Sequence, residues 1–185
     1  MPAAMSEHRI ILFRGMNTGG VRAPVAEQRA MAEAMGLENP RTLLASGNLV
    51  VESDRDPAVL EADVEAAMQD HFGLKIAAMV RTGRQWSELI SANPCPDEAR
   101  ADPSRLQVMV MKDGVRAEGV EAVRAFAVGA ERLIETPHAL WLWHPDGIGQ
   151  SKMAEKATQV RLLGMGTARN WNTVMKLADM VGVGR

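Results

Sequence analysis

The string RNWNTV, which begins at Arg169 near the end of the chain, holds the residues best suited to chemistry. Asn170 is of a type that accepts hydrogen bonds from the free N–H groups at a helix start. Those N–H groups and the helix dipole favour a bound anion, and the Arg169 guanidinium is suited to hold a phosphate or carboxylate through two parallel hydrogen bonds. With Asn172 and Thr173 in the same turn, the string predicts an anion-binding helix start.

Structural uses of these residues compete with that interpretation. Asn170 is a common type of helix cap whether or not a ligand is bound. Trp171 falls on one apolar helix face with Val174 and Ala178, as a core residue would. Arg169 would equally pair with an acidic residue at the surface. Spacing alone leaves both interpretations open.

A glycine-rich string, FRGMNTGG, occupies residues 13–20 and follows an apolar run. A strand, a glycine-rich loop and a helix in this order place backbone N–H groups where they cradle phosphates. Gly15 and Gly20 have the spacing of a Walker loop, but Val21 and Arg22 stand where Lys and Ser or Thr are required. The G-x-G-x-x-G spacing is missing as well, so we reject both nucleotide-binding motifs.

The same loop still offers Arg14 and Asn17 beside a donor-rich backbone at Gly19 and Gly20. The alternative is a tight turn, in which glycines supply backbone angles that other residues avoid. The turn at residues 46–48, between two short predicted strands, adds further polar side chains. We expect these loops to share one pocket for a small anionic ligand, lined by Arg14, Asn17, Gly19, Gly20, Ser46, Asn48, Arg169, Asn170, Asn172 and Thr173.

Other chemical constellations fail on spacing. Ser151 and Lys152 are adjacent and do not share a helix face, which argues against a Ser–Lys catalytic pair. The four His show no ligand spacing and the chain has one Cys, so we expect no metal and no cofactor. Trp141 and Trp143 share a strand face and could stack bases, but core packing is favoured. A solvated face is predicted for the carboxylates Glu61, Asp63, Glu65 and Asp70.

Composition limits the class of protein. The chain has 185 residues, 46% of them hydrophobic and 24% charged, as in ordinary globular proteins. Its net charge of −2 argues against extensive binding to nucleic acid, although residues 150–185 hold six basic and two acidic side chains. Cys95 is the only cysteine, and a signal peptide and long apolar runs are missing. These features predict a cytoplasmic protein that does not cross a membrane.

The order of apolar runs and turn residues predicts two similar halves. Residues 9–15, 41–53 and 75–81 read as strands, with helices over 25–35 and 57–72 between them, and a short helix over 84–92 follows. The second half repeats this pattern, with strands over 105–111, 131–137 and 139–145, a strand at 166–169, and helices over 117–127, 151–163 and 170–181.

The predicted fold class is therefore α+β, with two tandem ferredoxin-like (split βαβ) subdomains and a C-terminal helix. The proline-rich stretch at residues 93–104 is the best candidate for a linker between them. The expected halves are residues 1–92 and 105–185.

Four strings of the sequence resemble the signature blocks of the bacterial family known as domain of unknown function 1697. They are LFRGMNTGG, ASGNLVVES, PDGIGQSK and TARNWNTVMKL, in this order, and the resemblance covers residues 8–180. It implies a small cytoplasmic protein with two α+β halves of ferredoxin-like character. Because the family has no established activity, the resemblance implies no catalytic residues.

This chain departs from the family's usual blocks at Met16, Thr18 and Ala45, where an aliphatic residue, Val and Gln are more usual. Proposals that use those side chains are weakened, but the predicted ligand-binding residues are unaffected.

Three functions are considered on this basis. The leading one is a small-anion binding protein, with or without enzymatic turnover; the alternatives are single-stranded nucleic-acid binding and a protein-interaction module without catalysis.

Overall fold

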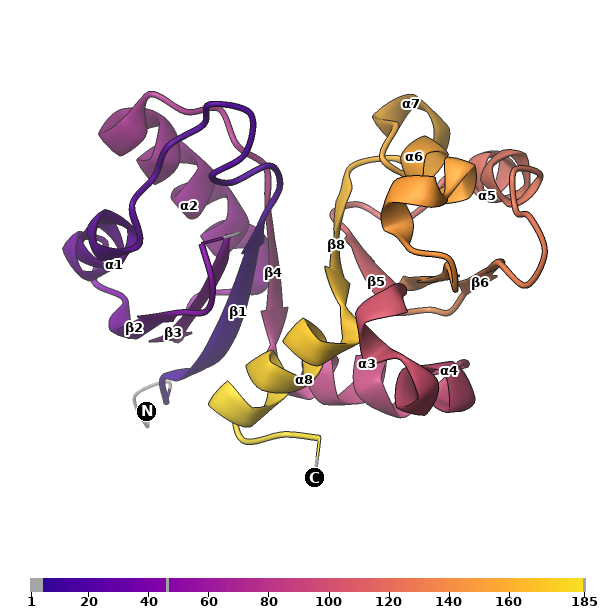
Figure 1. The fold of residues 1–185 in the computed structure, drawn as a ribbon. Helices are drawn as coiled ribbons and strands as arrows, with labels where there is room; N and C mark the ends of the chain where they lie inside the picture. The colour runs from indigo at the N-terminus through magenta and orange to yellow at the C-terminus, as the bar shows by residue number, and fades with distance from the viewer. Residues whose placement is uncertain (1–4, 46, 185) are drawn as a thin grey trace. The chain divides into compact units, whose positions relative to one another are not determined.

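The computed structural model describes residues 5–45 and 47–184, which form two four-stranded antiparallel sheets and eight α-helices (Figure 1). The predicted α+β class is confirmed. The chain divides into two compact units, which are described separately. The first unit consists mainly of the chain up to Ser87 together with Leu177–Val183, and the second mainly of Glu88–Lys176.

The first unit follows the predicted order of elements. Its sheet has the strand order β2-β3-β1-β4, and every neighbouring pair is antiparallel. The elements are β1 (Glu7–Phe13), α1 (Val25–Ala34), β2 (Glu38–Thr42), β3 (Asn48–Ser53), α2 (Pro57–Phe72), β4 (Ala78–Thr82) and α3 (Gly83–Ser91).

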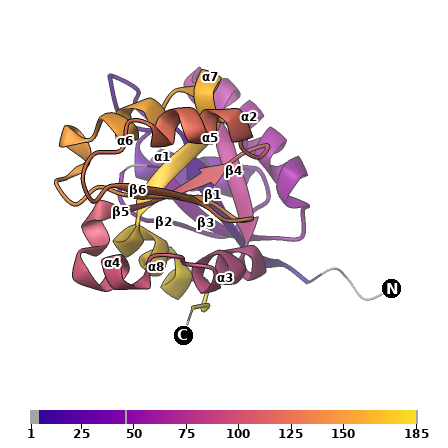
Figure 2. The same ribbon diagram turned by 90° about the vertical axis from the view of Figure 1, so that its right-hand side faces the viewer.

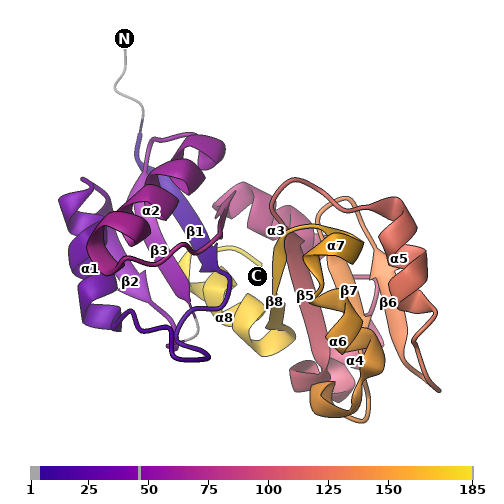
Figure 3. The ribbon, with the colours of Figure 1, turned by 90° about the horizontal axis from the view of Figure 1, so that it is seen from above.

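The core of the first unit lies between the sheet and helices α1 and α2, which Figures 1 and 3 show on the same side of the strands. Ile11 and Phe13 of β1 face these helices because alternate residues of a strand point to one side. Leu60, Val64 and Met68 form the apolar stripe of α2 in this core, and all three are fully buried. Each such side chain contributes roughly 1.5–3 kcal/mol on burial.

Helix α2 begins and ends as its sequence predicts. The Asp56 carboxylate accepts a hydrogen bond from the Ala58 N–H at 2.9 Å, and Pro57 occupies the first turn. Gly73 closes the helix in the left-handed conformation.

The solvated face predicted for α2 is wrong at Glu61 and Glu65. The Glu61 carboxylate accepts from the Val80 N–H at 3.0 Å, and the Glu65 carboxylate accepts from the Ala78 N–H at 3.1 Å. Strand β4 is an edge strand, and these bonds satisfy N–H groups that have no neighbouring strand. The helical pattern shows which residues share a face but not that this face lies along a sheet edge.

The second unit repeats the same order of elements, with one helix divided in two. Its sheet has the strand order β6-β7-β5-β8. The elements are α4 (Pro96–Ala101), β5 (Leu106–Met111), α5 (Ala117–Arg124), β6 (Arg132–Glu135), β7 (Leu140–Trp143), α6 (Lys152–Ala157), α7 (Val160–Leu163), β8 (Gly166–Asn170) and α8 (Trp171–Met180).

The single helix predicted over residues 151–163 is wrong, because the chain leaves the helix after Ala157. The Thr158 hydroxyl donates to the Glu155 carbonyl at 2.7 Å, and this local bond competes with continuation of the helix.

The second core lies under helices α5, α6 and α7, which Figure 2 shows on one side of the strands. Helix α5 packs closely against α7 at Gly119. A Cβ atom added to Gly119 would lie 1.6 Å from the Leu162 carbonyl oxygen. The glycine inside this helix is therefore a packing requirement.

Residues 93–104, predicted to be a linker, contain α4 and the start of the short 3-10 helix Pro103–Arg105. In residues 5–45 and 47–184, none of the helices combines the length and the apolar composition needed to cross a membrane.

Candidate functional site

The predicted ligand-binding residues are distributed over both units. Arg14, Asn17, Gly19, Gly20 and Asn48 belong to the first unit, whereas Arg169, Asn170, Asn172 and Thr173 belong to the second. Ser46 lies outside the described residues. Each group is considered within its own unit.

Asn17 holds the loop that follows β1. Its side-chain N–H₂ group donates to the carbonyls of Ala23 and Ala45, at 3.1 and 2.7 Å, and its oxygen accepts from the Ala23 N–H at 2.8 Å. The residue itself has a left-handed backbone, with φ of 55°. All the hydrogen-bonding groups of the amide are thus used to join residues 17–23 to the turn at residue 45.

The neighbouring turn is fixed by a close backbone approach. Gly47 has a φ of +89°, and a Cβ atom there would lie 2.7 Å from the Met16 Cβ. Asn48 is 1% exposed and donates from its side chain to the Leu43 carbonyl at 2.8 Å. These two residues position the turn in the first unit, and their polar groups face the main chain.

The remaining first-unit residues leave the loop surface open to solvent. Gly19 and Gly20 have positive φ angles of 55° and 90°, and both are exposed. The Arg14 side chain is half-buried, and its backbone N–H donates to the Ala77 carbonyl at 3.0 Å.

In the second unit, strand β8 runs directly into helix α8, and Asn170 is the last residue of the strand. The Asn170 side-chain oxygen accepts from the Thr173 N–H at 3.0 Å, which confirms the predicted cap. Thr173 is buried, and Asn172 is exposed on the first turn. The first turn of α8 is therefore ordered around Asn170.

Arg169 is the most deeply buried charge of the predicted set, at 9% exposure. Its guanidinium donates to the Thr167 hydroxyl at 2.8 Å and to the Ala168 carbonyl at 2.9 Å. Burial lowers the pKa of Arg169 to about 10, because a charge loses hydration there. The strand register places Arg169 opposite Val108, on the sheet face away from helices α5, α6 and α7.

The tryptophans on this face are packing residues. Trp141 is fully buried, donates from its indole N–H to the Thr136 hydroxyl at 3.0 Å, and packs on Trp171 with ring centroids 5.7 Å apart. A ring in this position does not offer a surface to a nucleic-acid base, in agreement with the favoured core interpretation.

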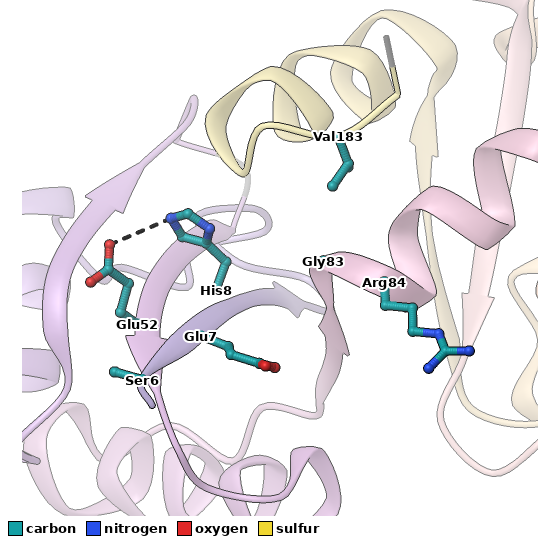
Figure 4. Close-up of a pocket in the computed structure, with 7 residues that line it drawn as sticks. All are labelled: Ser6, Glu7, His8, Glu52, Gly83, Arg84 and Val183. Atoms are coloured by element: carbon teal, nitrogen blue, oxygen red, sulfur yellow. Dashed lines mark ion pairs between the residues drawn. The ribbon is translucent and has the colours of Figure 1, made fainter. Parts of the chain in front are cut away.

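A cavity of about 470 Å³ lies in the first unit, at the opposite end of β1 from the Asn17 loop. Figure 4 shows its lining residues, Ser6, Glu7, His8, Glu52, Gly83, Arg84 and Val183. In this lining, the His8 Nε2 and Glu52 Oε1 atoms lie 3.4 Å apart on the paired strands β1 and β3. Sequence reasoning missed this pair because His8 and Glu52 become register partners only when β1 pairs with β3.

His144 was missed as well. It is 1% exposed, and both of its ring nitrogens are buried without a hydrogen-bond partner in the described part of the chain. Burial lowers the pKa of His144, and Glu131 and Arg105 are the charged groups that act on it. The HP dipeptide after β7 gives no sign that the imidazole is enclosed.

Comparison with known proteins identifies a family but not an activity. The family model described as "Protein of unknown function (DUF1697)" matches residues 5–141. Among solved structures, conserved bacterial protein SP0830 from Streptococcus pneumoniae is similar, with a TM-score of 0.75 and 21% identity over 95% of this chain and 99% of that chain. At this identity the likeness concerns the fold alone. None of the curated proteins matches this chain.

Proposed function

Because the chain belongs to the DUF1697 family of proteins of unknown function, we propose its function from its own residues: it binds a small phosphate- or carboxylate-bearing anion, with Arg169 as the central contact. Asn170, Asn172 and Thr173 supply the polar first turn of α8, at the positive end of the helix dipole.

The observation that carries the proposal is the environment of the Arg169 guanidinium. It is 9% exposed, it donates to the Thr167 hydroxyl and the Ala168 carbonyl, and Arg169 precedes the start of α8 by two residues. A guanidinium is suited to grip a phosphate or carboxylate, and the free N–H groups and dipole of a helix start favour the same kind of ligand. The lowered pKa of Arg169 has a physical cause, which is loss of hydration.

Within the first unit taken by itself, we propose that Arg14 and the exposed backbone at Gly19 and Gly20 contact an anion. Asn17 and Asn48 support these contacts indirectly, because their side-chain amides donate to backbone carbonyls that hold the loop and the turn. For the fold, the matching strand orders of the two sheets support the ferredoxin-like subdomains expected from the sequence.

The test is a thermal-unfolding screen against orthophosphate, pyrophosphate, a sugar phosphate, a nucleoside triphosphate and citrate. Wild type is compared with Arg169→Gln and with Arg161→Gln, which removes one charge from an exposed position of α7 in the same unit. For a ligand at 100 times its Kd, we expect a rise of about 5–10 °C in the wild-type midpoint. The rise should persist in Arg161→Gln and be lost in Arg169→Gln.

Equal midpoint shifts in all three proteins would show that the anions act on general charge and would remove Arg169 from the proposal. If no anion in the screen moves the wild-type midpoint, the proposed function itself is wrong.

A further inference from the structure

The outer edges of β4 and β8, the last strands of the two sheets, present backbone N–H groups in the same way. In an antiparallel ladder, every second residue of an edge strand turns its N–H group away from the sheet. Val80 does so in β4, where its N–H group donates to a side chain of α2. Ala168 has the same orientation in β8, because the Lys112 N–H group donates to the Met165 carbonyl and bonded pairs then alternate along the strand.

In the first unit, one carboxylate meets both the N–H group at the edge and the arginine that follows it. The Glu61 Oε2 atom accepts from the Val80 N–H at 3.0 Å and lies 3.8 Å from the Arg81 Nη1 atom. The same Nη1 atom donates to the Val80 carbonyl at 2.8 Å. The edge N–H group and the guanidinium beside it therefore form a binding arrangement for a carboxylate, and the bond to the carbonyl does not keep Arg81 from it.

The second unit repeats the donor groups of this arrangement. Ala168 occupies the position of Val80, and Arg169 that of Arg81. The Arg169 Nη1 atom donates to the Ala168 carbonyl at 2.9 Å. Ala168 is exposed, and in the part of the chain that the structure describes no side chain accepts from its N–H group. The edge of β8 thus offers a main-chain donor to solvent next to a guanidinium.

Within α6 and α7, as the structure describes them, no carboxylate takes the place of Glu61. The charged residue of α7 is Arg161. The acidic residue of α6 is Glu155, whose carboxylate is exposed and forms an ion pair with Lys152 at 3.2 Å. A carboxylate that completes the arrangement at β8 therefore has to come from outside these two helices.

We propose that the ligand bound at Arg169 is a small carboxylic acid, whose carboxylate also accepts a hydrogen bond from the Ala168 N–H group. The carboxylate of Glu61 shows in the first unit how one such group serves both contacts. This inference rests on the proposed anion binding and narrows it, because it names the acidic group of the ligand and adds a main-chain contact at the edge of β8.

The test is a titration of the ¹⁵N-labelled full chain with glutarate, followed by two-dimensional ¹H–¹⁵N NMR. Glutaramide, the neutral diamide of the same length, is the control ligand. With glutarate, the Ala168 amide proton should move downfield and reach saturation, because a carboxylate that accepts its hydrogen bond deshields it. The Val80 amide is the internal control and should stay in place, since it already donates to Glu61. Glutaramide should move neither amide.

Variants separate the two contacts. Arg169→Gln should weaken glutarate binding about tenfold or more, as expected for loss of a charged hydrogen bond. Ala168→Pro removes the N–H group at an edge position, where proline is tolerated, and should weaken binding by a similar factor. If Ala168→Pro does not fold, the Ala168 amide of the wild type and Arg169→Gln decide the question. Arg161→Gln removes an exposed charge of α7 and should change the affinity by no more than about twofold.

The inference is overturned if glutarate leaves the Ala168 amide in place, if glutaramide moves it equally, or if Arg169→Gln binds glutarate as the wild type does. A parallel titration with orthophosphate then tells the two proposals apart. If orthophosphate binds the wild type and loses affinity in Arg169→Gln, anion binding stands and the carboxylate contact at Ala168 is wrong. If neither anion binds at millimolar concentration, both proposals are wrong.

Discussion

The two units place an arginine at the same point of the fold and surround it differently. Arg81 is the fourth residue of β4 and Arg169 the fourth residue of β8, and each strand is the last of its sheet. Each guanidinium donates to the carbonyl of the preceding residue, at 2.8 Å in Arg81 and 2.9 Å in Arg169. The next residue caps the helix that follows in both cases, as Thr82 accepts from the Gln85 N–H and Asn170 from the Thr173 N–H.

Each of the two arginines contacts a side chain that the other does not. Burial lowers the pKa of Arg81, but the Glu61 carboxylate, 3.8 Å away, raises it. In the second unit a hydroxyl, that of Thr167, takes a bond from the equivalent arginine. The same backbone geometry accompanies an ion pair with Glu61 in one unit, and in our account it contributes to recognition of an external anion in the other.

The largest expected effect comes from breaking the internal pair. Glu61→Ala removes the carboxylate beside Arg81 and the acceptor of the Val80 N–H, so we expect a loss of about 2–4 kcal/mol in the free energy of unfolding. Urea denaturation measures it. Asp63→Ala, on the same helix with a half-exposed carboxylate, is the control and should cost less than about 1 kcal/mol. Equal losses would mean that Glu61 acts as an ordinary surface residue.

Removing the Thr167 hydroxyl, which accepts from Arg169 in the second unit, should cost less. Thr167→Val keeps the shape of the side chain and deletes the oxygen that accepts from Arg169, so a loss of about 1–2 kcal/mol is expected by urea denaturation. A cost as large as that of Glu61→Ala would mean that Arg81 and Arg169 depend equally on these side-chain partners.

The two helix caps should be nearly equivalent. Asn170→Ala and Thr82→Ala each remove one side-chain acceptor from a helix start, and each should cost about 1 kcal/mol. Thermal unfolding of both variants checks this. If removing one cap lowers the free energy of unfolding several times more than removing the other, the two helix starts are not energetically equivalent.

The smallest effect concerns pH and is confined to the second unit. Because the folded-state pKa of His144 is lowered, protonation favours the unfolded chain, and stability falls as pH drops below about 6.5. His144→Leu should remove this component. Urea denaturation at pH 7.5 and 5.5 compares the two proteins. A wild type and a variant with the same pH dependence would exclude His144 as the cause.

Much of the fold follows from local signals in the sequence. Asp56, Pro57 and Gly73 mark the ends of α2, and the cap at Asn170 was predicted from residue type alone. These features depend on residues within one or two turns, so a linear pattern contains them.

The rest depends on partners far apart in the chain. Asn17 was predicted as a ligand contact, but its partner at residue 45 is visible only after folding. The pairs Glu61–Arg81 and His8–Glu52 arise from the packing of α2 on the sheet and from strand register. The equivalence of Arg81 and Arg169 is hidden as well, because the residues around them differ in type.

The most direct test of the account is a titration of one anion, pyrophosphate, against wild type, Arg169→Gln and Arg81→Gln at a temperature where all three are folded. The account predicts that Arg169→Gln loses at least about tenfold in affinity, while Arg81→Gln binds as wild type does, because Glu61 already neutralises that arginine. Equal affinity in wild type and Arg169→Gln, or an equal loss in both variants, would contradict it.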